Sequence, residues 1–157
     1  MVSNSSNAIG ERRRRRLKAR GPPVPIRILI ADDNPFVRTA MREVLESVEP
    51  EWEIIEAEGG REAVAKAQEF RPGLIILDLV MPSMDGLTAA RKIGKLMPDI
   101  PVMMHTMYWS PRVTLLARTV GVRKVVAKSD SSALVSAVRE LLQSSAETPQ
   151  GEVRTSQ

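Results

Sequence analysis

The chain has 157 residues, of which 43% are hydrophobic and 27% are charged, so its composition is that of one globular domain and excludes disorder throughout. The absence of cysteine excludes disulfides, thiol nucleophiles and iron–sulfur clusters, and the single histidine argues against a zinc site. The net charge is +4, but residues 1–21 contain seven basic side chains and one acidic one, so the remainder is slightly acidic.

Composition divides the chain into three segments. Residues 1–25 hold the arginine run Arg12 to Arg16 and end in prolines, which predicts a disordered basic arm. Residues 26–143 form the expected domain, and residues 144–157 are polar and unpatterned, which predicts a flexible tail. Three interpretations of the arginine run stay open. It is a solvated tail, it contacts nucleic acid or another anionic surface, or it is an upstream extension whose presence depends on which start codon is correct. Because it lacks interleaved aromatic residues, we expect at most weak, non-specific nucleic-acid binding.

The sequence shows no membrane or secretion signal. Its apolar runs fall short of the about 18 residues that a membrane span needs, and no signal-peptide pattern follows the arginines. We therefore expect a cytoplasmic protein without a membrane span.

Five aliphatic runs alternate with helical patterns along residues 26–143, which is typical of βαβ units around a parallel sheet. The second run is the most polar and suits a sheet edge. Right-handed crossovers then place helices on both faces, which predicts a doubly wound, flavodoxin-like α/β fold with strand order 2-1-3-4-5. The strands are expected at Ile26–Ala31, Trp52–Ala57, Leu74–Asp78, Ile100–His105 and Lys124–Lys128.

The helical patterns carry recognisable start and stop signals. Asn34 and Pro35 open the first helix, and Ser110 and Pro111 open the fourth, which ends at Gly121. The others are expected at Arg61–Phe70, Leu87–Met97 and Ala133–Leu142.

Polar residues stand at four of the five predicted strand ends, where ligands bind in open parallel sheets. Asp32 and Asp33 follow the first strand, and Asp78 ends the third. With these strands as neighbours, the three carboxylates converge and repel one another unless a hard cation joins them, which indicates Mg²⁺. Together with the Thr106 hydroxyl and the Lys128 ammonium at the other strand ends, they predict an aspartyl-phosphate site.

Four motifs resemble the receiver domain of two-component response regulators. They are IRILIADD at 26–33, LIILDLVMPSMDG at 74–86, VMMHT at 102–106 and Lys128-Ser129-Asp130. The resemblance covers roughly residues 26–143 and is closest to receivers that are usually fused to a helix-turn-helix output domain. Because only 14 residues follow the fifth predicted helix, we expect a stand-alone receiver.

The resemblance implies that Asp78 accepts a phosphoryl group from a histidine kinase or phosphotransfer protein. It implies Mg²⁺ ligands at Asp32, Asp33, Asp78 and the backbone carbonyl of Val80, and phosphoryl contacts from Thr106 and Lys128. The chain would then catalyse only its own phosphorylation and dephosphorylation, without being a turnover enzyme.

The resemblance also implies an output surface made by helix four, strand five and helix five. This face would bind a downstream protein, and receivers of this family often pair through it as homodimers. The chain departs from the family at Val125, where an aromatic residue is common, and at Met107, where a small residue is common. Tyr108 and Trp109 are either a partner-facing anchor or a partly covered loop.

Two alternatives stand beside this hypothesis. A receiver-like module that has lost its switch would bind a partner constitutively, which Val125 and Met107 favour slightly and the intact set of aspartates, Thr106 and Lys128 disfavours more. An aspartyl phosphatase needs an acid two residues after its nucleophile, and this chain has Val80 there. We further expect His105 to be a packed strand-end residue, and Asp85-Gly86 to be a turn and helix cap.

Overall fold

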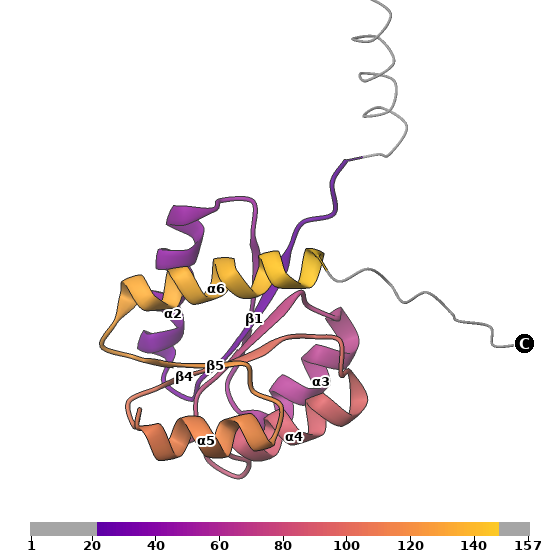
Figure 1. The fold of residues 1–157 in the computed structure, drawn as a ribbon. Helices are drawn as coiled ribbons and strands as arrows, with labels where there is room; N and C mark the ends of the chain where they lie inside the picture. Colours follow the sequence, from indigo (N-terminus) through magenta and orange to yellow (C-terminus); the bar gives the residue numbers. More distant parts are fainter. Residues whose placement is uncertain (1–21, 148–157) are drawn as a thin grey trace, which may run out of the picture.

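The computed structural model describes residues 22–147 and forms a five-stranded parallel sheet with helices on both faces (Figure 1). The strand order β2-β1-β3-β4-β5 confirms the predicted doubly wound, flavodoxin-like α/β fold. The strands are β1 (Arg27–Ala31), β2 (Glu53–Ala57), β3 (Leu74–Leu77), β4 (Val102–Thr106) and β5 (Lys124–Ala127). The helices are α2 (Pro35–Val48), α3 (Gly60–Phe70), α4 (Gly86–Leu96), α5 (Pro111–Thr119) and α6 (Ser131–Ala146). The arginine run and the last ten residues of the chain lie outside the described residues.

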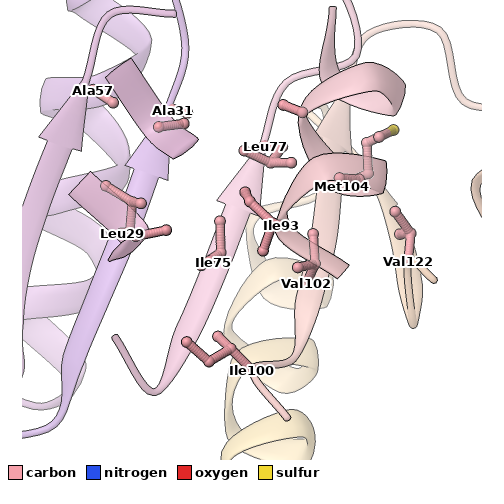
Figure 2. Packing of buried hydrophobic residues seen from close by; sticks show 14 of the residues in the cluster. Leu29, Ala31, Ala57, Ile75, Leu77, Ile93, Ile100, Val102, Met104 and Val122 are labelled. Carbon is pink, nitrogen blue, oxygen red and sulfur yellow. The ribbon is translucent and has the colours of Figure 1, made fainter. Parts of the chain in front are cut away.

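One face of the sheet packs against α3, α4 and α5. Leu29, Ile75 and Val102 lie on this face in three adjacent strands, and Ile93 of α4 lies beside Ile75 and Val102 (Figure 2). Because successive strand side chains point to opposite faces, their neighbours in sequence enter a second cluster.

The second cluster lies on the opposite face, under α2 and α6. It contains Ile28, Ile76 and Met103 from the strands, together with Leu45 of α2 and Val138 of α6. Burial on both faces explains the nearly continuous apolar runs of β1, β3 and β4. β2 lies at a sheet edge, as predicted from its polar residues.

The predicted helix starts are confirmed by their caps. The side chain of Asn34 accepts a hydrogen bond from the Phe36 amide at 3.0 Å, and that of Ser110 accepts one from the Val113 amide at 3.1 Å. Asp85 caps α4 as expected, because its carboxylate accepts a 2.7 Å hydrogen bond from the Thr88 amide. These caps hold the loops that follow the strands.

Several predicted bounds differ from the structure by one to four residues, and two of these differences have a clear physical reason. β4 begins at Val102 and not at Ile100, since Pro101 has no amide to give to the sheet. α6 continues to Ala146, past Leu142, where the helix was expected to end. The hydroxyls of Ser144 and Ser145 donate to the carbonyls of Glu140 and Leu141, so the helix tolerates these polar residues in its last turn. In the described part of the chain, no helix is both long and apolar enough to cross a membrane.

Candidate functional site

Two strand ends bring three carboxylates together. Asp32 and Asp33 follow β1, Asp78 follows β3, and the two strands pair with Ala31 opposite Leu77. An oxygen of each carboxylate lies within 4.8 Å of one on each of the other two. Asp32 is 2% exposed and Asp78 is 6% exposed, whereas Asp33 is open to solvent. The cluster therefore has a buried inner pair and one outer carboxylate.

Lys128 lies between the two buried carboxylates. Its Nζ is 2.7 Å from Asp32 Oδ2 and 3.0 Å from Asp78 Oδ2. Burial acts to lower the pKa of Lys128, but hydrogen bonds and charge interactions with both carboxylates raise it above its usual value. The ammonium is therefore protonated at neutral pH and links the ends of β1, β3 and β5.

The charge of the cluster is not balanced by the side chains around it. Burial raises the pKa of Asp78; the hydrogen bond from Lys128 opposes this shift, and the charge of Asp32 adds to it. One ammonium is too few to balance three carboxyl groups. Because hard divalent cations prefer oxygen ligands, this donor set fits Mg²⁺.

The other predicted site residues also follow or end strands at this edge of the sheet. Thr106 ends β4 and is fully buried, and its Oγ1 accepts a 3.0 Å hydrogen bond from the Tyr108 amide. The hydroxyl keeps its own hydrogen for donation. Val80 lies in the loop between Asp78 and α4 with its side chain mostly exposed.

The loop after Thr106 is open to solvent. Met107 is 77% exposed, Tyr108 is 63% exposed and Trp109 is 53% exposed, so the aromatic pair is partly covered and still accessible to a partner. Trp109 and Val125 line a cavity of about 370 Å³ next to this loop. The structure thus has space beside Val125, where the family commonly has an aromatic side chain.

His105 is a packed residue at the end of β4, as expected. It is buried and its Nδ1 has no hydrogen-bond partner. Burial, with a smaller contribution from the charge of Lys128, lowers the pKa of His105 to about 4. The imidazole is therefore neutral at physiological pH.

Two residues that support the site were missed at the sequence level. Arg38 of α2 is buried, and its Nη1 donates a 2.7 Å hydrogen bond to the backbone carbonyl of Asp32. A Cβ at Gly86 would lie 2.1 Å from the carbonyl oxygen of Asp78, so only glycine fits there. An arginine in a polar helix pattern resembles a solvated residue, and Gly86 resembled an ordinary turn glycine. The only available signals were their positions just after the acidic motifs.

Comparisons with known proteins agree with this geometry. The family model described as the response regulator receiver domain matches residues 28–139. The response regulator protein VraR of Staphylococcus aureus is 36% identical over 108 residues, which are 68% of this chain and 51% of VraR. VraR of Staphylococcus saprophyticus is 33% identical over 119 residues, covering 74% of this chain and 56% of that protein. The chain thus spans about half the length of the curated relatives it matches.

Solved structures give the same result for the fold. A LuxR-family two-component response regulator from Aurantimonas has a TM-score of 0.73 at 29% identity, with 77% of this chain and 87% of that chain covered. The Vibrio cholerae chemotaxis protein CheY4 has a TM-score of 0.70 at 26% identity, with 75% and 99% covered.

Proposed function

Because this chain belongs to the family of response regulator receiver domains in two-component signalling, we propose that Asp78 accepts a phosphoryl group from the phosphohistidine of a histidine kinase or phosphotransfer protein. Phosphorylation of an aspartate and binding of Mg²⁺ are typical of the family. The observation that carries the proposal is the buried pair of Asp32 and Asp78 with Lys128 between them.

In the proposed transfer, a carboxylate oxygen of Asp78 forms a bond to phosphorus while the bond from phosphorus to the donor imidazole nitrogen breaks. The imidazole leaves and takes up a proton. Lys128 then pairs with one phosphoryl oxygen, and the Thr106 hydroxyl donates to another, so both groups stabilise developing negative charge. The proposed ligands of Mg²⁺, which would neutralise phosphoryl charge when bound, are Asp32, Asp33, Asp78 and the carbonyl of Val80.

We propose that phosphorylation changes partner binding through the face of α5, β5 and α6. The exposed loop from Met107 to Trp109 adjoins this face and follows Thr106 directly, so a movement of the hydroxyl toward the phosphoryl group would move the loop. A downstream protein or a second phosphorylated copy would bind there. A cytoplasmic location and weak nucleic-acid contact through the arginine run belong to the same proposal.

A phosphoacceptor role fits the site better than a turnover phosphatase. The side chain two residues after Asp78 is that of Val80, which offers no general acid. A second candidate, constitutive binding without a switch, is favoured by Val125 and Met107, which stand where the family commonly has an aromatic and a small residue. Beryllofluoride separates these two: a switching receiver shifts the NMR signals of Met107 to Trp109, whereas a constitutive module leaves them unchanged.

Intact-protein mass spectrometry after incubation with acetyl phosphate and Mg²⁺ tests the phosphorylation itself. We expect one added phosphoryl group on the wild type, none on Asp78→Asn and none in excess EDTA. Asp99→Asn is the matched control, because Asp99 is an exposed carboxylate that pairs only loosely with Arg71 at 3.6 Å. An unmodified wild type, or a modified Asp78→Asn variant, would contradict the proposal.

A further inference from the structure

Arg38 is the only charged residue of α2 that is buried. Its Nη1 donates a 2.7 Å hydrogen bond to the Asp32 carbonyl, and its Nη2 lies 3.7 Å from Glu58 Oε1. Glu58 is exposed, so this longer ion pair contributes little. The Nε of Arg38 is buried and has no hydrogen-bond partner. Because burial of a guanidinium costs free energy, the bond to Asp32 is the contact that compensates for it.

The carbonyl that Arg38 binds belongs to the peptide unit joining Asp32 to Asp33. On the other side of Asp32, its amide donates to the Ala57 carbonyl at 3.2 Å. The Asp32 carboxylate also accepts a 2.9 Å hydrogen bond from the Asn34 amide. The sheet ladder ends at Ala31, so Arg38 takes the place of a strand partner for the first carbonyl beyond it.

We propose that Arg38 is a positioning residue for the acidic cluster. It fixes the plane of the Asp32–Asp33 peptide and thereby sets the directions in which the two carboxylates leave the chain. Arg38 contacts a carbonyl and no carboxylate oxygen of the cluster, so it orders the ligands without occupying an atom that a cation would need. That the cation is Mg²⁺ rests on the proposed function. That Arg38 fixes the orientation of the Asp32–Asp33 peptide does not depend on it.

Calorimetric titration of the full-length, unphosphorylated protein with Mg²⁺ tests the effect on the cluster. We expect Arg38→Met to weaken Mg²⁺ binding about tenfold, as is typical when a residue that orients metal ligands is lost. Arg38→Lys keeps a donor and a charge and should recover part of the affinity. Arg42→Met is the matched control, since Arg42 lies one turn further along α2 and pairs only with Glu46 and Glu56. Affinity within twofold of wild type in folded Arg38→Met would overturn the proposal.

A second measurement on the metal-free protein separates this inference from the proposed function. The Asp33 amide belongs to the peptide unit that Arg38 holds, and the Asn34 amide is bonded to Asp32. We expect Arg38→Met to shift the NMR signal of Asp33 and speed hydrogen exchange at Asn34, with no change in Arg42→Met. If both amides are unchanged, Arg38 does not position the turn. If wild type binds no Mg²⁺, the metal part of the proposed function fails. The NMR signal of Asp33 and the hydrogen exchange at Asn34 then test the role of Arg38 by themselves. Arg38→Lys serves both measurements if Arg38→Met does not fold.

Discussion

The ammonium of Lys128 lies 3.0 Å from the carboxylate of Asp78, although the two residues are 50 positions apart in the chain. Asp78 follows β3 and Lys128 follows β5, with β4 between those strands. The contact forms only when the whole sheet is assembled. The contact places a cation beside Asp78, whose pKa is raised by burial. This arrangement is expected for a carboxyl group that must ionise in a buried site.

Replacing Lys128 with methionine should destabilise the metal-free protein by about 3 kcal/mol at pH 7, because two buried carboxylates lose their shared cation. The loss should be smaller at pH 5. Because the pKa of Asp78 is raised in the folded protein, Asp78 takes up a proton at a higher pH there than in the unfolded chain. This proton removes the repulsion between the Asp78 and Asp32 carboxylates. Urea denaturation at both pH values measures this.

The double variant Lys128→Met/Asp78→Asn provides the control for that measurement. With only one buried carboxylate left unpaired, it should be more stable than Lys128→Met alone. Equal stability of the two variants would show that the second buried carboxylate is not what destabilises Lys128→Met.

The substitution Gly86→Ala should displace the backbone of Asp78, although Gly86 is not itself one of the proposed site residues. Its Cβ would lie 2.1 Å from the Asp78 carbonyl oxygen, which belongs to backbone and cannot rotate away. We expect a loss of about 2 kcal/mol in stability and slower phosphorylation by acetyl phosphate. Gly94→Ala in the same helix is the matched control, because its nearest neighbour is 3.7 Å away and alanine favours a helix interior. Equal behaviour of the two variants would contradict the close approach.

The fold was predictable because its signals are local and repeated. Apolar runs and helical periods identify the elements, and caps such as Asn34 and Ser110 mark where helices begin. The errors lay at the ends of elements. Pro101, just before β4, shifted a strand start, and serine hydroxyls that bond to the preceding turn let α6 run past Leu142.

The candidate site was predictable only where chemistry coincides with strand ends. Asp32, Asp33, Asp78, Thr106 and Lys128 are all at such ends, and the strand order decides which of them meet. The contacts of Arg38 and Gly86, which support the site, could not be predicted from the positions of strand ends. The bond from Arg38 to a carbonyl depends on side-chain direction, and the crowding at Gly86 depends on how one loop packs on another.

His105 should make the folded protein sensitive to acid. The unfolded chain binds a proton at His105 near its ordinary value of 6.5, whereas the folded protein does so only at about 4. Stability is therefore lost as the pH falls from 6.5 toward 4, by about 3 kcal/mol in total. His105→Leu removes this titration, so its stability relative to wild type should increase steadily between pH 7 and pH 4.5. A constant difference in urea denaturation across that range would contradict a buried neutral imidazole.

Val125 and Val126 are neighbours in β5 that face opposite sides of the sheet, and they should respond differently to the same change. Val125 lines the cavity of about 370 Å³ beside Trp109, whereas Val126 packs in the cluster under α2 and α6. Val125→Phe can extend into the cavity and should cost little stability. Val126→Phe overfills a packed core and should cost about 1–3 kcal/mol. Thermal denaturation compares the two, and Trp109 fluorescence reports whether the new ring enters the cavity. A loss at Val125 as large as that at Val126 would mean that the cavity does not accept a ring, and that the exposed loop after Thr106 has no room to fold inward there.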